Sequence, residues 1–330
     1  MKRALPIALS LILLALAGIA CGGKTEPAIA FISDRDGNNE IYILEARGTP
    51  PRRLTTSPSI SESSPVVSPD GKKVAYLSDR GGISGLYVID FDGANERRVA
   101  GPAGARTAFS WSPDGQRIAF EVVADGGSDI YVSDIEGNRT IRVTREPGRD
   151  ELGDWSRDGQ WLVYSLTTGD RIGINRKNPD GVNEIRLTER FDGSPRWSPD
   201  GTRIAFASKR DAVDTDIYVV DINGSKELNV TNATGNDYDF DWSPDSRRLV
   251  FLSDRDGNPE VYVQVVGQKE ATRLTRNNAQ ERHPRWSADG REILFSSDAD
   301  GDFDIYVMRP DGLKQERLTL NDSGDSQGSW

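Results

Sequence analysis

Three acidic segments are the part of the sequence best suited to hold a metal ion. Each has aspartates at alternate positions beside a glycine: Asp34-Arg35-Asp36-Gly37, Asp254-Arg255-Asp256-Gly257 and Asp298-Ala299-Asp300-Gly301-Asp302. Ca²⁺ is a hard cation that prefers oxygen ligands, which clustered carboxylates provide. The same pattern is typical of an Asx-type hairpin turn, and a full EF-hand loop also needs a bidentate carboxylate at its end. The turn is therefore favoured, and calcium is the alternative, with these candidate ligands: Asp34, Asp36, Asp254, Asp256, Asp298, Asp300 and Asp302.

A second set of residues stands three positions before each copy of a recurring tryptophan. Its seven members are Ser64, Ala108, Leu152, Ser194, Asp239, His283 and Gln327. The last three are polar and come from consecutive copies, which makes them candidates for a polar or metal-binding cluster. However, the chain has one histidine and one cysteine, Cys21, so a multi-histidine centre and a cysteine zinc cage are excluded. We expect a solvated histidine here, and no cofactor other than the calcium considered above.

Charged side chains of both signs flank these positions and suggest a surface for a peptide or a protein loop. The candidate partner-binding residues are Arg149, Asp150, Glu151, Arg190, Asp237, Tyr238, Asp239, Glu281, Arg282, His283 and Gln327. The alternative is a solvated rim, since charged residues are mostly exposed in any protein. The chain has no Gly-x-Ser-x-Gly nucleophile elbow and no glycine-rich phosphate loop. We therefore expect a binding protein and not an enzyme.

The element that positions these residues is a repeat of about 44 residues. Segments of the type Trp-Ser-Pro-Asp-Gly begin at Trp111, Trp155, Trp197, Trp242 and Trp286, with Val67 and Trp330 in the equivalent places, so successive copies are 42 to 45 residues apart. A fixed period of this size indicates a propeller or a solenoid. Each copy contains four short runs of β-branched and aromatic residues separated by Gly, Pro, Asp and Asn, which is the pattern of strands.

The two ends of the repeat array predict a closed ring. The first strand-like run, 28–31, matches the second strand of a copy, and the last, 328–330, matches a first strand. The simplest arrangement completes the N-terminal blade with the C-terminal strand, which removes two unpaired sheet edges. The sequence thus predicts an all-β fold over residues 28–330, a single seven-bladed β-propeller with four-stranded antiparallel blades. In such a ring we expect the tryptophans to pack between neighbouring blades.

The repeats resemble the TolB-like β-propeller family. The resemblance rests on Trp-Ser-Pro-Asp-Gly, on Ile-Ala-Phe, on the segment 253–263 and on Arg-Leu-Thr, and it covers residues 28–330. It implies a propeller whose members include periplasmic scaffold proteins of the cell envelope that bind partners at the mouth of the channel. We therefore expect a non-enzymatic envelope binding or scaffold protein whose partner is a protein or peptide.

Two enzyme classes share this architecture and supply the alternatives. Propeller lyases that act on pectic oligosaccharides hold a metal largely through histidines at the channel, and this chain offers only His283. Peptidases of the prolyl-oligopeptidase type carry their nucleophile in a separate α/β-hydrolase domain, for which the 330 residues leave no room. The alternative function is a carbohydrate-binding or carbohydrate-cleaving propeller.

The N-terminus predicts export. A basic start, Met1-Lys2-Arg3, precedes an uncharged run rich in Leu, Ile and Ala, so we expect a signal peptide over residues 1–20. The following Cys21 resembles the lipidated cysteine of bacterial lipoproteins, although Gly18 replaces the usual leucine, and 21–27 is expected to be a tether. This favours a lipid anchor in the cell envelope, with a soluble periplasmic or secreted protein as the alternative. The 52 acidic against 41 basic residues argue against nucleic-acid binding, and we expect a monomer.

Overall fold

The computed structural model describes residues 27–99, 105–124, 126–169, 171–210 and 213–330. The predicted signal peptide over 1–20, the predicted lipidation site Cys21 and the tether as far as residue 26 lie outside the described residues. Within the described part of the chain, no helix is long and apolar enough to cross a membrane.

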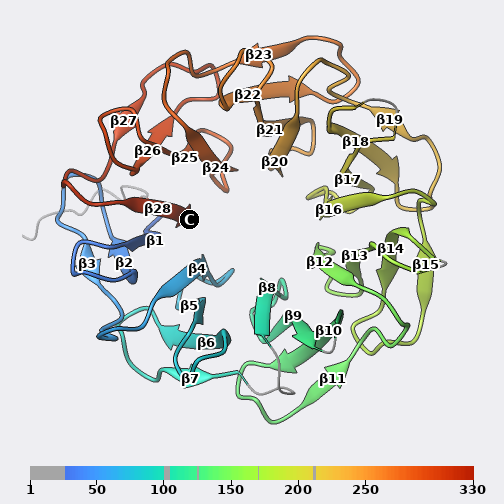
Figure 1. Cartoon of the computed structure of the whole chain (residues 1–330), viewed down its shortest axis with the longest axis horizontal. Coiled ribbons are helices and arrows are strands. Elements are labelled where there is room, and N and C mark those ends of the chain that lie inside the picture. The colour runs from blue at the N-terminus through green and yellow to red at the C-terminus, as the bar shows by residue number, and fades with distance from the viewer. Residues whose placement is uncertain (1–26, 100–104, 125, 170, 211–212) are drawn as a thin grey trace, which may run out of the picture.

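Seven four-stranded antiparallel sheets are arranged in a ring around a central channel (Figure 1). This confirms the predicted seven-bladed propeller. We number the blades along the chain from the blade that contains β1, and we number the strands of each blade outward from the channel. The inner strands of blades one to seven are β28 (Asp325–Ser329), β4 (Glu62–Val67), β8 (Ala105–Trp111), β12 (Asp150–Trp155), β16 (Asp192–Trp197), β20 (Asp237–Trp242) and β24 (Glu281–Trp286).

The remaining strands follow the same order in every blade. The second strands are β1 (Ile29–Ser33), β5 (Lys73–Ser78), β9 (Arg117–Ala124), β13 (Leu162–Leu166), β17 (Arg203–Ser208), β21 (Arg248–Ser253) and β25 (Ile293–Ser297). The third strands are β2 (Glu40–Leu44), β6 (Gly85–Asp90), β10 (Gly127–Asp134), β14 (Gly173–Lys177), β18 (Asp216–Asp221), β22 (Glu260–Val265) and β26 (Asp304–Met308). The outer strands are β3 (Arg52–Arg53), β7 (Arg97–Arg98), β11 (Thr140–Arg142), β15 (Glu184–Arg186), β19 (Leu228–Asn229), β23 (Ala271–Arg273) and β27 (Glu316–Arg317).

The turn after each inner strand shows how the repeat sequence fixes local structure. In blade three, the Ser112 hydroxyl donates to Asp114 at 2.5 Å, and the Gly115 N–H donates to the Ser112 carbonyl at 2.8 Å. Gly115 has a φ of 67°, a conformation that glycine adopts without steric cost. Serine, aspartate and glycine are thus selected by the tight hairpin that returns the chain from the channel to the second strand.

The recurring tryptophans pack between blades, as predicted. Trp111 of blade three is buried against Ala75 and Val88 of blade two as well as against Ile118 and Phe120 of its own blade. Its indole N–H also donates to a carbonyl of the preceding inner strand, that of Val66, at 3.1 Å. The indoles of Trp155 and Trp242 donate in the same way to the carbonyls of Ser110 and Arg196. These three tryptophans therefore contribute apolar contact and a directional bond to the blade before them, whereas the indole nitrogens of Trp197, Trp286 and Trp330 are buried without a hydrogen-bond partner among the described groups.

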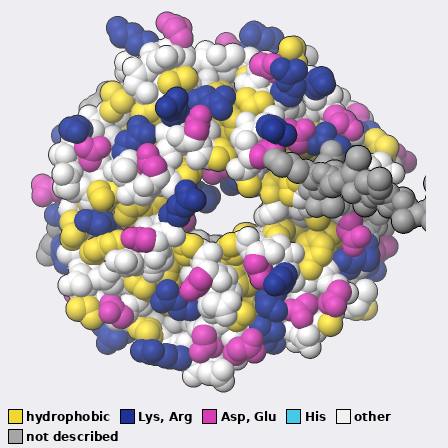
Figure 2. Space-filling model, turned by 180° about the vertical axis from the view of Figure 1, so that it is seen from behind, with side chains coloured by type: hydrophobic (Ala, Val, Ile, Leu, Met, Phe, Trp, Pro, Cys, Tyr) yellow, Lys and Arg dark blue, Asp and Glu magenta, His cyan; other side chains and the backbone are white. Residues whose placement is uncertain are grey.

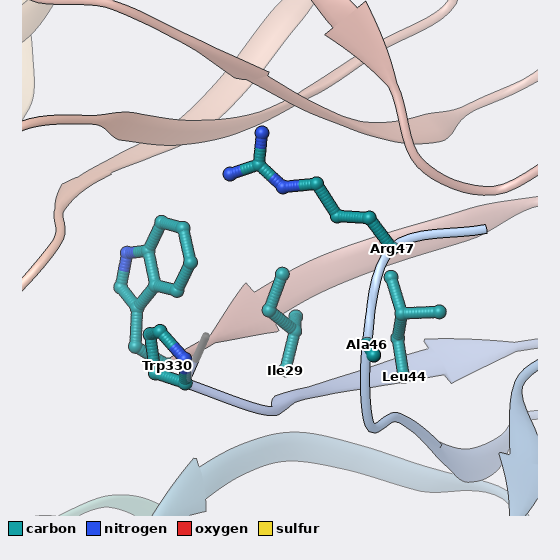
Figure 3. A pocket seen from close by; sticks show the side chains of 6 residues that line it. Ile29, Leu44, Ala46, Arg47 and Trp330 are labelled. Atoms are coloured by element: carbon teal, nitrogen blue, oxygen red, sulfur yellow. The ribbon is translucent and has the colours of Figure 1, made fainter. Parts of the chain in front are cut away.

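The ring is closed by the last strand, as predicted. β28 pairs with β1 in antiparallel register, and the guanidinium of Arg35 donates to both carboxylate oxygens of Asp325 at 2.9 and 3.1 Å. On the outside of this junction Arg47 forms ion pairs with Glu292 and Glu316 of blade seven. Figure 3 shows Trp330, Ile29 and Arg47 around the small pocket where the last residue of the chain lies beside the first blade. Strand pairing, ion pairs and the terminal indole together join the first blade to the last.

The antiparallel strand order gives the propeller two distinct faces. The mouth face carries the loops from second to third strands and from each outer strand to the next inner strand. The turn face carries the Ser-Pro-Asp-Gly turns and the turns from third to outer strands. The acidic segments and the predicted partner-binding residues all belong to the mouth face or to the adjoining ends of its strands.

Deleting residues 325–330 is expected to destabilise the whole ring. The deletion leaves the edge of β1 without its partner strand and removes Asp325, which neutralises Arg35. We expect the melting temperature to fall by ~10 °C or more, with association of the truncated chains visible in size-exclusion chromatography. The matched variant Trp330→Ala, which keeps the strand, should cost only ~2 kcal/mol. A truncated chain that melts like the intact one would contradict closure by β28.

Candidate functional site

The channel is divided into a neutral side and a charged side. Its main cavity has a volume of about 570 Å³, with Val66, Ala108 and Phe109 on the neutral side. The residue directly before each tryptophan or its equivalent faces this channel, and in blades four to seven these residues are Asp154, Arg196, Asp241 and Arg285. Seen from the side opposite to Figure 1, the channel is open and hydrophobic side chains edge much of it (Figure 2). The channel can therefore receive a group that is partly apolar and partly charged.

A bulge in each inner strand determines how the predicted channel residues behave. Five residues three positions before the tryptophan position have a left-handed backbone, with φ between 45 and 54°: Ser64, Ser194, Asp239, His283 and Gln327. The strand register shifts at the same place, for example between Tyr238 and Asp241. Such a conformation is strained for residues other than glycine and persists only where neighbouring contacts hold it.

The contacts that hold these bulges link neighbouring blades. Gln327 of blade one accepts the backbone N–H of Ser64 in blade two at 2.6 Å. Asp239 of blade six accepts the backbone N–H of His283 at 3.1 Å and pairs with Arg285 at 2.8 Å, both in blade seven.

Burial and the neighbouring charges act on the pKa values of these groups. Burial would raise the pKa of the Asp239 carboxyl, but the charge of Arg285 brings it below its usual value. Burial lowers the pKa of His283, whose Nδ1 is buried without a hydrogen-bond partner among the described groups. The three predicted residues are thus structural links as well as channel residues.

An arginine–carboxylate pair recurs where the inner strand begins. In four blades an arginine of the loop after the second strand reaches the first carboxylate of the inner strand. The pairs are Arg35–Asp325, Arg80–Glu62, Arg210–Asp192 and Arg255–Asp237. Each arginine also lies over a tyrosine of the third strand, with its Cζ 4.5 to 4.8 Å from the ring centroid. Burial of the carboxylates is tolerated here because each has a charged partner.

Two inner-strand carboxylates have no such arginine. Asp150 begins the inner strand of blade four and Glu281 that of blade seven, and one oxygen of each is buried without a hydrogen-bond partner. Burial disfavours the charged carboxylate and raises the pKa of both groups to about 7. Glu281 retains hydrogen bonds from Asn277 at 2.8 Å and Ser297 at 3.2 Å, both to the same oxygen.

The burial of the predicted partner-binding residues corrects part of the sequence-based hypothesis. Arg149, Arg190 and Arg282 are exposed on the mouth face. The residues that are half-buried there are Glu151, Tyr238, Asp239, His283 and Gln327. Asp150, Asp237 and Glu281 are buried and therefore do not lie on an exposed rim. They begin inner strands, and the first side chain of an inner strand points into the blade beneath the mouth loops.

The acidic segments are largely neutralised by arginines of the outer strands. Arg53 pairs with Asp36 and Glu40, and Arg273 pairs with Asp256 and Glu260. In blade seven, Arg317 pairs in the same way with Asp300 and Asp304.

The first aspartate of each acidic segment instead accepts a backbone hydrogen bond. The carboxylates of Asp34, Asp254 and Asp298 accept the backbone N–H groups of Gly324, Asn236 and Gln280. These contacts account for most of the acidic residues without a metal ion.

Asp302 is the exception among the acidic residues. The equivalent residues Asn38 and Asn258 use their side-chain amides to donate to two loop carbonyls and to a glutamate. A carboxylate cannot donate in this way, and Asp302 Oδ2 is buried without a hydrogen-bond partner among the described groups. Its pKa is raised by burial and by the nearby charges of Asp322, Asp325 and Asp34. Possible ligand atoms of Asp300, Asp302 and Asp304 all lie within 4.8 Å of one another, so calcium remains a prediction for this loop.

The alternation of charge in the channel was not predicted. The residues directly before the tryptophans of blades four to seven are alternately aspartate and arginine, and this order can be read from the sequence: Asp154, Arg196, Asp241 and Arg285. Asp154 accepts the backbone N–H of Trp197 at 3.0 Å and Asp241 that of Trp286 at 2.9 Å. Burial raises the pKa of Asp154 to about 7.

Asp302→Asn is expected to stabilise the protein. The amide restores the donor that Asn258 provides in blade six, which should add ~1 kcal/mol to the free energy of unfolding. If this loop binds calcium, the alternative to an ordinary turn, millimolar Ca²⁺ should raise the melting temperature of the unsubstituted protein and leave that of Asp302→Asn unchanged. The matched variant Asn258→Asp should lower the melting temperature. If Ca²⁺ shifts neither melt, the calcium hypothesis is wrong; if Asp302→Asn is destabilising, the amide argument is wrong.

Glu281→Gln and Asp150→Asn are expected to change how stability depends on pH. A carboxyl group whose folded pKa is about 7, against ~4 in the unfolded chain, stabilises the fold below pH 4 and loses this contribution as pH rises through 7. The neutral variants should therefore gain ~2 kcal/mol relative to the unsubstituted protein at pH 8 compared with pH 4.5. Urea unfolding at both pH values measures this difference. Equal differences at the two pH values would show that neither carboxyl titrates between them.

Comparison with known proteins places this geometry in a family. The sequence-family model of the TolB β-propeller domain matches residues 25–105 and 182–268 of this chain. No curated protein sequence matches the chain. TolB from Acinetobacter baumannii is 20% identical, with a TM-score of 0.64, and the match covers 93% of this chain and 67% of that one. Oligogalacturonate lyase from Vibrio parahaemolyticus is 16% identical, with a TM-score of 0.70 and 86% of both chains covered.

The propeller also occurs in peptidases. The β-propeller domain of the trilobed protease from Pyrococcus furiosus is 15% identical, with a TM-score of 0.69, and the match covers 90% of this chain and 96% of that domain. At such identities the structural likeness shows a shared fold and nothing about activity. The family model, in contrast, matches the repeats themselves over half of the sequence. The chain therefore belongs to the TolB β-propeller domain family.

Proposed function

We propose that this protein is a non-enzymatic binding protein of the cell envelope that holds a protein or peptide partner on its mouth face. The observation that carries the proposal is a set of exposed arginines on that face, Arg149, Arg190 and Arg282. None of the three has an ion-pair partner within the described residues, whereas most of the surrounding carboxylates are paired internally. Arg282 lies over the ring of Phe303, and in a chain with a net charge of −11 cations without an ion-pair partner suit an acidic segment of a partner.

The direction of β1 supports this orientation of the binding face. The chain enters β1 from the turn face, and Cys21 precedes Pro27 by six residues, a reach of at most about 20 Å. A lipid on Cys21 would therefore hold the turn face toward the membrane. The mouth face would then point away from the membrane, where a partner can approach it.

A carbohydrate-binding or carbohydrate-cleaving propeller is the second candidate. Its support is the buried His283 Nδ1 without a partner, in a channel that Gln327 also lines. His283 is the single histidine of the chain, and the carboxylate group with metal-ligand spacing in the described residues does not include it. A histidine-rich metal centre therefore does not fit this channel.

Charge reversal on the mouth face tests the proposed function. The mature chain from residue 22 is immobilised and exposed to solubilised envelope extract, and captured proteins are identified by mass spectrometry. We expect Arg149→Glu, Arg190→Glu and Arg282→Glu together to reduce capture of the principal partner at least ~10-fold, because like charges oppose an acidic segment. The melting temperature should stay within ~2 °C, since all three side chains are exposed.

The matched control reverses three exposed lysines of the turn face, Lys72, Lys226 and Lys269. This variant has the same change in net charge and should capture the partner as well as the unsubstituted protein does. Equal loss in both variants would indicate a non-specific charge effect. Unchanged capture by the mouth variant would contradict binding through this face, and a glycan screen with the same proteins would then test the second candidate.

A further inference from the structure

Blades one, two, five and six show how this repeat binds a guanidinium group. In blade six, Arg255 donates through Nε to Ser253 Oγ at 2.7 Å and through Nη2 to Asp237 at 2.8 Å, and it lies over Tyr262. Blades one, two and five use the same three kinds of contact: a serine that ends the second strand, a carboxylate that begins the inner strand and a tyrosine of the third strand. A planar guanidinium can satisfy all three at once.

Blade seven has the same three groups but not the arginine. Glu281 pairs with Ser297 in the register in which Asp237 pairs with Ser253. Tyr306 stacks on Phe295 with 5.5 Å between ring centroids, as Tyr262 stacks on Phe251 at 5.8 Å. However, Ala299 occupies the position of Arg255.

The contacts of these three groups reflect the missing side chain. Glu281 lacks the ion pair that its equivalents have; its unpartnered Oε2 is not itself distinctive, because one oxygen of Glu62, Asp192 and Asp237 is also buried without a hydrogen-bond partner among the described groups. Ser297 and Ser253 both hydrogen-bond the carboxylate of the inner strand, but only Ser253 also accepts from an arginine. Tyr306 is half-buried, although the tyrosines that lie beneath arginines, Tyr42, Tyr87, Tyr218 and Tyr262, are buried. Ala299 itself is exposed, so this site adjoins solvent on the mouth face.

The two other blades without a loop arginine do not keep this set of groups. In blade three, Arg106 stands at the carboxylate position and lies over Phe120, with 5.3 Å between Cζ and the ring centroid. In blade four, Leu166 replaces the serine and Asn175 replaces the tyrosine, so that only Asp150 remains. Among the described blades, the seventh alone combines all three guanidinium-binding groups with an unfilled arginine position.

The loop of blade seven carries more carboxylates than cations, although the exposed Arg282 lies over Phe303 beside it, and this balance favours a cation from outside the chain. Asp298, Asp300 and Asp302 belong to the same loop as Ala299, and Asp302 has no cationic partner among the described residues. A compact ammonium group could pair with Glu281, but it could not match the tyrosine face and two acceptors in one plane. The geometry is therefore selective for arginine over lysine.

We propose that blade seven binds the guanidinium of an arginine side chain supplied by a partner protein, stacked on Tyr306 and paired with Glu281. This inference deepens the proposed function, on which its biological role rests, by naming a chemical group that the partner presents. The partner segment would then place an arginine at blade seven and acidic residues near Arg149 and Arg190, in blades four and five.

Binding of model compounds tests the site without a partner. Nα-acetyl-L-arginine methylamide and its lysine counterpart are titrated into the mature protein and followed by NMR chemical shifts. We expect the arginine compound to bind at least ~10-fold more tightly than the lysine compound, with shifts centred on residues 281 and 306. Equal affinity for the two compounds, or no arginine binding up to ~20 mM, would overturn the proposal.

Two variants decide whether the binding occurs at this place. Ala299→Arg supplies the side chain from within the protein, so it should abolish binding of the arginine compound and raise the melting temperature. Glu281→Gln should weaken binding at least ~10-fold while the protein remains folded. Retained binding by Ala299→Arg would overturn the proposal.

Two controls keep the result specific. Ala288→Arg adds the same charge on the turn face and should leave binding unchanged. Asp150→Asn removes the other unpaired carboxylate and should also have no effect, because its blade lacks the serine and tyrosine; an effect of either control would contradict the assignment to blade seven. Loss of partner capture in the mouth-face variant concerns the proposed function, whereas failure of the arginine compound to bind concerns this site alone, so the two failures are distinguishable.

Discussion

The contact between neighbouring inner strands is the interaction on which the rest of this propeller depends. A four-stranded blade buries only part of its apolar surface by itself, and in blades three to seven a tryptophan at the end of the inner strand completes the burial against the blade before it. The indole N–H of Trp111, Trp155 or Trp242 fixes the spacing of the two strands through a backbone carbonyl. Because each blade needs a neighbour on both sides, the ring must close, and β28 provides the closure.

This requirement limits where function can lie. Residues that face the channel also connect blades, as Asp239 and Gln327 do through the backbone of the next blade. A substitution at such a position therefore lowers the stability of the ring as well as changing the binding of a ligand. In the loops of the mouth face, the side chains of Arg149, Arg190 and Ala299 are exposed and do not connect neighbouring inner strands. Binding is therefore better separated from stability at the loops than in the channel.

The sequence was sufficient for the fold because the repeat encodes every element locally. Proline, glycine and aspartate mark the turns, the strand runs are short and regular, and the mismatched ends specify closure. The site was harder to predict, because neighbours in space come from different copies of the repeat. Asp237 and Glu281 look alike in the sequence as charged residues beside a loop, yet both are buried and only Asp237 has an arginine. Asp302 looked like a calcium ligand, but its missing amide donor became evident only beside Asn258.

In a repeat protein, equivalent residues of different blades can be compared within one structure. Four copies of the repeat show which groups contact one another, and a copy that lacks one member of the set shows which contact has been lost. In blade four the arginine, the serine and the tyrosine are all replaced, so the remaining set no longer fits a guanidinium. In blade seven only the arginine is replaced, and Glu281 remains buried without the ion pair that its equivalents in blades one, two, five and six have. An uncompensated loss of this kind destabilises the blade, and a ligand that supplies the missing group would recover the lost interaction on binding.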